Sequence, residues 1–232
     1  MNLQWYEFAN KDELDLQLAQ QIAQQLQAAI TERGSASLAV SGGRTPAGMF
    51  KVLRSSAIDW SKVIITLVDE RWVSNDHADS NERLTRENLL QDCAAAATFI
   101  SMVNDAATPH AGLEGIEAQF STIKAPIDII ILGMGDDGHT ASLFRNAIEL
   151  EAVCASTAWV AAVTPPAAPH QRITLTLPTI AQCRNLLVHI TGEGKKALLN
   201  NAMAEQKPVT EQYPIRRVID QAASQPQVYW AA

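Results

Sequence analysis

The sequence has few cysteines and no long apolar segment, and each shortage argues against a class of protein. Its 232 residues include only three cysteines, widely spaced and without a CxxC pair. We therefore expect neither a disulfide framework nor a cysteine-based zinc site, and a reducing compartment fits best. No apolar run approaches a membrane span, and the amino terminus lacks a basic region followed by an apolar one. These features predict a soluble, cytoplasmic protein.

Basic residues are also scarce. The chain has 18 Lys and Arg against 25 Asp and Glu, a formal net charge of −7 at pH 7. Nucleic acids and anionic membranes attract proteins through clustered basic residues, so this balance argues against a nonspecific surface for either. A small anionic ligand is still compatible with it, because a few local arginines and lysines outweigh the global charge inside a pocket.

Several well-known catalytic motifs are missing. The sequence contains no GxxxxGK[ST] phosphate loop, no GxSxG serine elbow, and no HExxH or facial-triad spacing of metal ligands. The sequence therefore indicates no metal site, no Walker-type nucleotide site and no serine nucleophile of that type.

The chain does contain apolar, β-rich runs that alternate with helical segments. Apolar residues make up 47% of it, enough to bury a sizeable core, and we expect one domain over residues 1–232. Strands are expected at 38–40, 63–68, 99–100, 127–132, 172–177, 186–190 and 228–230. Helices are expected at 12–33, 46–53, 80–90 and 112–123, with a final long helix after Gly192. This alternation predicts an α/β fold with a mainly parallel sheet and helices on both faces.

Three details of these elements are open to test. Gly34 is expected to end the first helix, and Thr45 to cap the helix that Pro46 opens. The segment 172–177 alternates in polarity and is expected to be a half-buried strand.

The most informative segment is the junction at which the strand 127–132 meets a loop rich in glycine. Three glycines there accompany Asp136, Asp137 and His139. This polar content is natural at the carboxyl end of a buried strand, where open α/β sheets bind their ligands. Glycines let the backbone turn sharply and approach a ligand, and an imidazole suits proton transfer near neutral pH. A lone histidine is more often structural, but this setting favours a functional one.

A second strand end, 41–46, has two glycines between a strand and the start of a helix. Free amide N–H groups in such a turn can bind an anion, and Arg44 can add a charge-assisted hydrogen bond. The alternative is an ordinary tight turn, which a Gly-Gly pair alone would favour.

A third strand end places Asp69, Glu70 and Arg71 after an apolar strand, with 80–81 shortly after. Charged residues there suggest the rim of a pocket, and Arg71 can bind a phosphate or a carboxylate through two hydrogen bonds. A surface ion pair or a helix cap is the alternative. Arg172 and Lys195 form a weaker group, which either closes on a phosphate or lies in solvent.

Taken together, these segments resemble the 6-phosphogluconolactonase family, over nearly the whole chain and in the family's order. The matching segments are 41–46, 69–73 with 80–81, 132–144, 172–176 and 192–195. Arg145 and Gln171 stand where the family usually has proline. Both changes alter loop geometry and leave His139 in place.

The resemblance implies a Rossmann-like fold, no cofactor, no metal, and hydrolysis of 6-phospho-D-glucono-1,5-lactone in the pentose phosphate pathway. His139 would be the general base that activates water, and Asp137 would orient it. Arg71 would serve either the phosphate or the reacting carbonyl. The implied phosphate-binding residues are Ser41, Gly42, Gly43, Arg44, Thr45 and Lys195, and the other substrate-binding residues are Asp69, Gly135 and Arg172. The expected partner is this small-molecule sugar-phosphate lactone, and the expected assembly is a monomer or a weak homodimer.

Two rival functions fit less well. Glucosamine-6-phosphate deaminases share the Gly-x-Asp-Gly-His loop, but there it continues as an Ile-Ala-Phe-Asn type sequence, whereas this chain continues as 140–144. The deaminases also tend to place an aromatic residue at the position of Arg71. A noncatalytic sugar-phosphate sensor would lose the catalytic residue and often carry a DNA-binding domain. His139 is present, no helix-turn-helix pattern is visible, and the chain is acidic.

Overall fold

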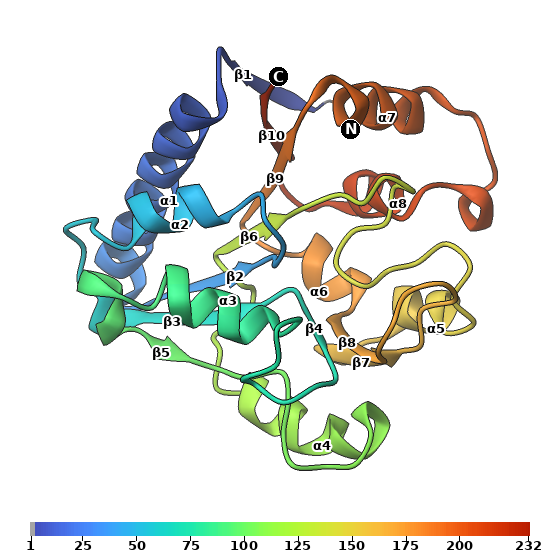
Figure 1. The fold of residues 1–232 in the computed structure, drawn as a ribbon, viewed down its shortest axis with the longest axis horizontal. Coiled ribbons are helices and arrows are strands. Elements are labelled where there is room, and N and C mark those ends of the chain that lie inside the picture. Colours follow the sequence, from blue (N-terminus) through green and yellow to red (C-terminus); the bar gives the residue numbers. More distant parts are fainter. Residues whose placement is uncertain (1–2) are drawn as a thin grey trace.

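A parallel sheet forms the centre of the computed structural model, which describes residues 3–232 (Figure 1). Residues 1–2, part of the predicted domain and of the amino terminus discussed above, lie outside the described residues. Within that range the sheet has seven strands in the order β1-β10-β9-β6-β2-β3-β5. The strands are β1 (Gln4–Phe8), β2 (Ala36–Val40), β3 (Val63–Leu67), β5 (Thr98–Phe99), β6 (Ile129–Leu132), β9 (Asn185–Thr191) and β10 (Gln227–Ala231). Every neighbouring pair is parallel, which confirms the predicted fold class.

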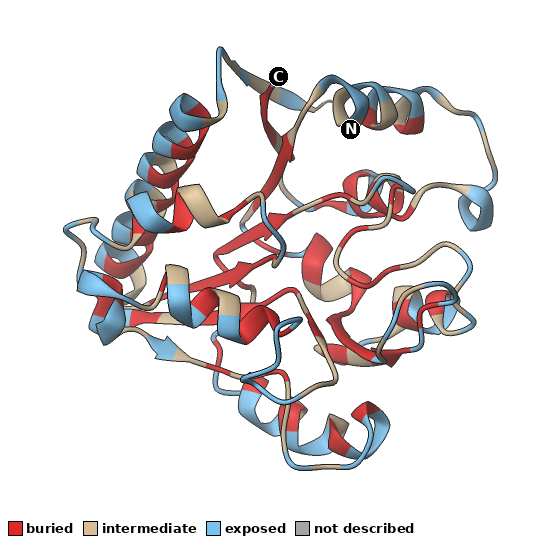
Figure 2. Ribbon diagram, in the orientation of Figure 1, coloured by how far each residue is buried: buried red, intermediate tan, exposed pale blue. Residues whose placement is uncertain are grey.

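The central strands are buried along their whole length because helices cover the sheet. All residues of β2 and of β6 are buried (Figure 2), as expected for apolar strands enclosed on both faces. The longer helices are α1 (Lys11–Arg33), α3 (Asn81–Asn88), α4 (Pro109–Phe120), α7 (Glu193–Ala204) and α8 (Pro214–Gln221). Shorter ones are α2 (Ala47–Leu53), α5 (Leu150–Ala155) and α6 (Leu177–Ala181), with 3-10 turns at Trp60–Lys62, Asp92–Ala96 and Val209–Glu211.

Helix α1 follows its sequence signals closely. Its buried side chains include Leu18, Ile22 and Leu26, the predicted four-residue repeat. Asn10 caps the start by accepting a hydrogen bond from the amide of residue 13, and Gly34 ends the helix with a φ of 79°. The prediction that Gly34 stops this helix is confirmed.

Other local predictions were wrong. Thr45 does not cap α2, because the helix begins at residue 47 and Pro46 holds the capping position without a side-chain hydrogen bond. The long helix expected after Gly192 is present as α7, which Gly192 caps, but it is not the final helix, because α8 follows it after a 3-10 turn and was not predicted.

A second, antiparallel sheet lies beside the first and was not predicted. It consists of β4 (Asp69–Arg71), β8 (Arg172–Leu175) and β7 (Val160–Val163), with β8 in the middle. The expectation of a half-buried strand over 172–177 was wrong, because all four residues of β8 are buried. Thr176 then caps helix α6, so the strand also ends earlier than predicted.

The order of the central strands explains where a ligand can bind. After β2 the chain forms β3, which pairs with one edge of β2. Strand β6 pairs with the opposite edge of β2, and β9 pairs with the other edge of β6. The connections therefore diverge between β2 and β6, the kind of switch point at which open α/β sheets bind ligands. The loops that follow β2 and β6 leave the sheet at this place.

Candidate active site

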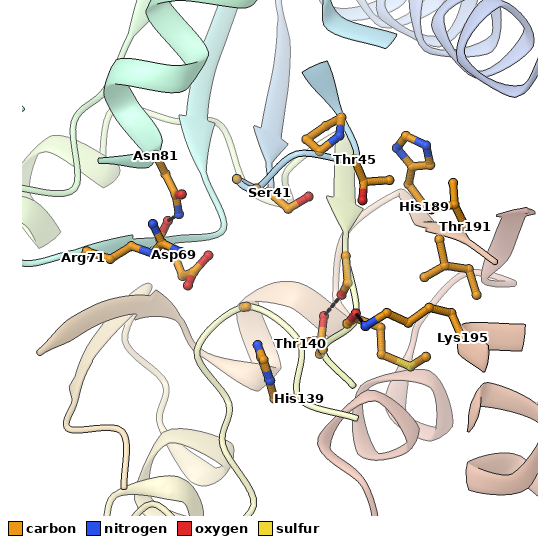
Figure 3. A pocket seen from close by; sticks show the side chains of 18 residues that line it. Ser41, Thr45, Asp69, Arg71, Asn81, His139, Thr140, His189, Thr191 and Lys195 are labelled. Atoms are coloured by element: carbon orange, nitrogen blue, oxygen red, sulfur yellow. Dashed lines mark hydrogen bonds between the residues drawn. The ribbon is translucent and has the colours of Figure 1, made fainter. Parts of the chain in front are cut away.

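A cavity of about 260 Å³ opens at the carboxyl edge of the central strands. Its size lies just under the range of about 300–1,000 Å³ that is usual for small-molecule pockets. Figure 3 shows three groups of side chains around it, from the β3–α3 region, from β9 with α7, and from the loops after β2 and β6. The lining residues are Ser41, Gly42, Gly43, Thr45, Pro46, Asp69, Arg71, Asn81, Gly133, Met134, Gly135, His139, Thr140, Ala141, His189, Ile190, Thr191 and Lys195.

The loop after β6 is closed by its own hydrogen bonds. The amide of Gly135 donates to the carbonyl of His139 at 2.9 Å, and the amide of Gly138 donates to the carbonyl of Gly135 at 3.1 Å. The Thr140 hydroxyl donates to the carbonyl of Gly133 at 2.7 Å. Gly138 has a φ of 75°, a conformation that favours glycine. These bonds hold His139 at the cavity.

His139 and Asp137 form a hydrogen-bonded pair. Nδ1 of His139 lies 2.5 Å from Oδ1 of Asp137, and the His139 amide donates to the same oxygen at 3.2 Å. Because a carboxylate only accepts, Nδ1 carries the proton of this hydrogen bond, and in the neutral imidazole Nε2 is left with a free electron pair. Partial burial alone would raise the pKa of Asp137, but the hydrogen bonds from His139 and the positive charge of its protonated form outweigh it and lower that pKa below its usual value. The pair has the arrangement of a general base and its orienting carboxylate.

The glycine at position 135 is required by this packing. A Cβ atom there would lie 2.1 Å from Cε1 and Nδ1 of His139 and 2.7 Å from Oδ1 of Asp137. Phe144 packs on the other side of the imidazole, with ring centroids 4.7 Å apart. The ring therefore has little freedom to move.

The turn after β2 contributes four of its predicted residues to the cavity. Ser41, Gly42, Gly43 and Thr45 line it, whereas Arg44 is exposed and lies outside the lining. Gly43 has a φ of 87°, and a Cβ at Gly42 would lie 1.8 Å from the side-chain oxygen of Asn81. The turn therefore packs directly against the start of α3.

Glu70 holds together the side of the cavity that is formed by β4 and the start of α3. Its carboxylate is fully buried and accepts hydrogen bonds from the amides of Arg71, Asn81 and Glu82 and from the hydroxyl of Ser80. Burial raises the pKa of this carboxyl, and the four hydrogen bonds oppose the rise. The helix-cap alternative thus holds for Glu70, while its neighbours face the cavity.

Asp69 and Arg71 line the cavity on either side of Glu70. Asp69 accepts a hydrogen bond of 2.6 Å from the hydroxyl of Ser142. Arg71 donates through one guanidinium nitrogen to the carbonyl of Asp79, which holds the side chain at the rim.

Arg172 lies beside Arg71 without reaching the cavity lining. The two residues are paired across β4 and β8, and Arg172 is buried. Burial, and then the positive charge of Arg71, lower the pKa of Arg172. Two guanidinium groups therefore lie side by side here, with the carboxylates of Asp69, Glu70 and Asp79 close to them.

Lys195 reaches the cavity from the first turn of α7. Its Nζ donates to the carbonyl of Met134 at 2.5 Å and lies 2.8 Å from Oδ1 of Asp136. The lysine in turn lowers the pKa of Asp136. The start of α7, like that of any helix, carries partial positive charge, so the ammonium group and the helix act in the same direction.

Sequence reasoning missed His189 as a cavity residue. The prediction that it lies within a strand is confirmed, but it also faces the cavity and is only 2% exposed. Neither ring nitrogen has a hydrogen-bond partner in the described part of the chain, and Oδ1 of Asp15 is 3.7 Å from Nε2. Burial, assisted by the charge of Lys11, lowers the pKa of His189 to about 3. Asn81, Thr140 and Thr191 also line the cavity. Asn81 and Thr140 belong to segments that carry the family resemblance, and Thr191 is the last residue of β9.

Comparison with known proteins identifies the family. A family model described as glucosamine-6-phosphate isomerases/6-phosphogluconolactonase matches residues 9–230. The chain therefore belongs to this family. Within it, the chain belongs to the 6-phosphogluconolactonase branch, because relatives with that name match it over their whole length.

Two relatives and one crystal structure carry this assignment. A 6-phosphogluconolactonase of Rhizobium meliloti is 41% identical over 233 residues and is covered completely, as is this chain. One from Neisseria meningitidis is 41% identical, with 98% of each chain covered. The crystal structure of a 6-phosphogluconolactonase from Shewanella baltica superposes with a TM-score of 0.96 at 42% identity, covering 100% of this chain and 98% of the other.

Proposed function

We propose that this chain hydrolyses 6-phospho-D-glucono-1,5-lactone to 6-phospho-D-gluconate in the oxidative pentose phosphate pathway. One observation carries the proposal. His139, which Asp137 holds by a hydrogen bond, lines the same cavity as the Gly42–Gly43 turn and Lys195, so one small molecule can reach both a base and a cationic end. The names of the relatives at about 40% identity agree with this substrate.

In the proposed reaction, Nε2 of His139 removes a proton from a water molecule whose oxygen attacks the lactone carbonyl. The new C–O bond places negative charge on the former carbonyl oxygen. Arg71 or loop amides meet that charge, and one well-placed donor contributes roughly 3 kcal/mol. When the intermediate collapses, the C–O bond to the ring oxygen breaks and the imidazolium returns its proton to that oxygen. Asp137 keeps the imidazole in the required tautomer throughout.

The phosphate would lie at the opposite end of the cavity. The amides of Gly42 and Gly43, the hydroxyls of Ser41 and Thr45, and the ammonium group of Lys195 are the available donors. His189, whose ring nitrogens have no hydrogen-bond partner among residues 3–232, adds a neutral donor at this wall. Arg44 lies outside the lining, and its assignment to the phosphate stays a prediction.

Lys195→Ala should mainly raise KM, because phosphate is bound equally in the ground and transition states.

The deciding experiment compares lactone hydrolysis by the wild type and by His139→Ala. We expect kcat to fall by about 10²-fold or more, the usual scale for loss of a general base. His110→Ala is the matched control, because His110 is an exposed imidazole on α4, outside the cavity. An unchanged kcat in a folded His139→Ala protein would contradict the base assignment.

The same proteins should be assayed with glucosamine 6-phosphate. We expect no release of ammonia, since residues 140–144 after His139 match the lactonases and not the Ile-Ala-Phe-Asn type sequence of the deaminases. Deamination that disappears in His139→Ala, without lactone hydrolysis, would assign the chain to the rival activity.

A further inference from the structure

Two histidines and an aspartate meet at the rim, outside the cavity lining. His77 and Asp79 belong to the segment between β4 and α3, and His170 ends the proline-rich segment that precedes β8. One possible ligand atom from each residue lies within 4.8 Å of the other two. Imidazole and carboxylate are ligands that zinc and similar ions prefer. No local spacing in the sequence shows this set, because His170 is 91 residues away from Asp79.

The spacing of the donor atoms suits one ion. Nε2 of His170 lies 3.1 Å from Oδ2 of Asp79, and Nδ1 of His77 lies 3.9 Å from the same oxygen. Donors bonded at about 2.0–2.1 Å to a tetrahedral ion lie about 3.3–3.4 Å apart. The two observed distances lie on either side of that value, so small side-chain shifts are enough to bring the atoms into position.

The hydrogen bonds of the two imidazoles show what metal binding requires. The amide of Asp79 donates to Nδ1 of His77 at 3.0 Å, so this nitrogen is unprotonated and can bind a metal in place of that hydrogen bond. Nε2 of His170 donates to the carboxylate of Asp79, so this nitrogen releases its proton when a metal takes its place between the two groups. All three side chains are partly exposed, so an ion can enter and a water molecule can take a fourth position.

The backbone of His170 has an uncommon conformation. Its φ is 69°, a left-handed conformation that is uncommon for a residue other than glycine. Such a conformation persists only where surrounding contacts hold it, and it is a reason to look for a function. Here the carbonyl of His170 accepts a long hydrogen bond of 3.4 Å from Arg172, while the imidazole faces Asp79.

We propose that His77, Asp79 and His170 bind one divalent transition-metal ion of the zinc class. The bound ion ties the proline-rich segment to the segment that follows β4. Arg71, which lines the cavity, donates a hydrogen bond to the carbonyl of Asp79. The proposed metal ligand Asp79 is therefore also the residue that holds Arg71 in place. Magnesium and calcium are not expected to bind, since two of the three ligands are imidazoles.

Titration calorimetry with zinc chloride tests the site, using protein free of a histidine tag and treated with a chelator. We expect each chain to bind one zinc ion at His77, Asp79 and His170, with a Kd of about 10 µM or tighter. His170→Ala and His77→Ala should each weaken binding by about tenfold or more. His110→Ala, which removes an exposed histidine elsewhere, should leave the affinity unchanged, and magnesium chloride should give no binding heat.

The cavity imidazole is a competing zinc site, and His139→Ala separates the two. Zinc binding that persists in His139→Ala and is lost in His170→Ala supports the rim site, with or without a second ion in the wild type. Zinc binding that is lost in His139→Ala and kept in His170→Ala overturns the proposal, as does the absence of binding up to about 1 mM zinc. Circular dichroism of each variant checks that it is folded. Because no substrate is used, the result is independent of the proposed lactonase activity.

Discussion

At the scale of single residues, the absence of a side chain at Gly135 determines where the imidazole of His139 can lie. A methyl group there would meet the ring at 2.1 Å, so Gly135→Ala must displace the ring, the loop, or both. We expect kcat for lactone hydrolysis to fall by about 10²-fold, a loss comparable to that of a misplaced catalytic group.

Gly194→Ala is the control for this substitution. A Cβ at Gly194, in the first turn of α7, would meet no atom within 4 Å. Activity should be unchanged, and the free energy of unfolding should change by no more than about 1 kcal/mol. Equal kcat in both alanine variants would show that the position of His139 tolerates movement.

His189 gives a residue-scale prediction for stability. Its pKa is lowered to about 3, first by burial and then by the charge of Lys11. Between about pH 6.5 and 3 the unfolded chain therefore binds more protons than the folded one, so stability is lost as the pH falls through this window. The loss approaches about 1.4 kcal/mol per pH unit for one such group.

Urea unfolding at pH 7 and pH 5 measures this effect. His189→Leu should reduce the difference between the two free energies of unfolding, because it removes the titrating ring. An equally steep pH dependence in His189→Leu would assign the loss of stability to groups other than His189.

The two residues that replace the family's usual prolines have clear local settings. The guanidinium of Arg145 lies 5.4 Å from the ring centroid of Tyr213, at cation–π distance. The carbonyl of Gln171 accepts a hydrogen bond of 2.8 Å from the amide of Trp72, and a proline would offer the same acceptor. Neither change reaches the cavity lining.

At the scale of elements, one buried carboxylate joins β4 to α3. Glu70 accepts four hydrogen bonds there. Glu70→Gln replaces one carboxylate oxygen, which accepts hydrogen bonds, with an NH2 group. That group would face the N–H and O–H donors that now bind the carboxylate. We expect it to lower the free energy of unfolding by about 2–4 kcal/mol, which corresponds to a fall in Tm of about 5–10 °C.

Glu87→Gln is the matched control on the same helix. Glu87 forms an exposed ion pair with Arg83, and such pairs contribute about 0–1 kcal/mol. A thermal melt that moves equally in both variants would contradict the anchoring role of Glu70.

Elements with strong local signals were predictable, and elements defined by their neighbours were not. Helix α1 has its own cap, its own stop and a regular apolar repeat, so its existence and its end at Gly34 follow from the sequence. The strand β8 alternates in polarity, yet other parts of the fold cover both of its faces, since all four of its residues are buried. The short strand β1 escaped prediction because its partner, β10, lies at the other end of the chain. The short strand β7 also escaped prediction, although its partner, β8, is the next strand in the chain.

At the scale of the whole molecule, an acidic chain brings basic side chains to its cavity. The net charge is −7, whereas Arg71 and Lys195 line the cavity and Arg172 is paired with Arg71 across β4 and β8. We expect inorganic phosphate to compete with the substrate, raising KM while leaving kcat unchanged.

Steady-state kinetics in phosphate and in sodium chloride of equal ionic strength tests this expectation. Chloride should raise KM far less, because it screens the rim without occupying a phosphate site. Equal effects of the two salts would mean that general screening, and not a phosphate site, sets the affinity. The expected monomer or weak homodimer stays a prediction, which sedimentation velocity can check.

The sequence by itself determined which strand ends carry polar chemistry, because strand, glycine turn and histidine are local signals within a few residues. It also determined the fold class, since alternating strands and helices allow few arrangements. Only the tertiary structure decided that Arg44 lies outside the cavity lining, that His189 lies within it, and that His77, Asp79 and His170 meet at the rim. These facts depend on pairing and packing between segments far apart in the chain, and no local pattern encodes such distances.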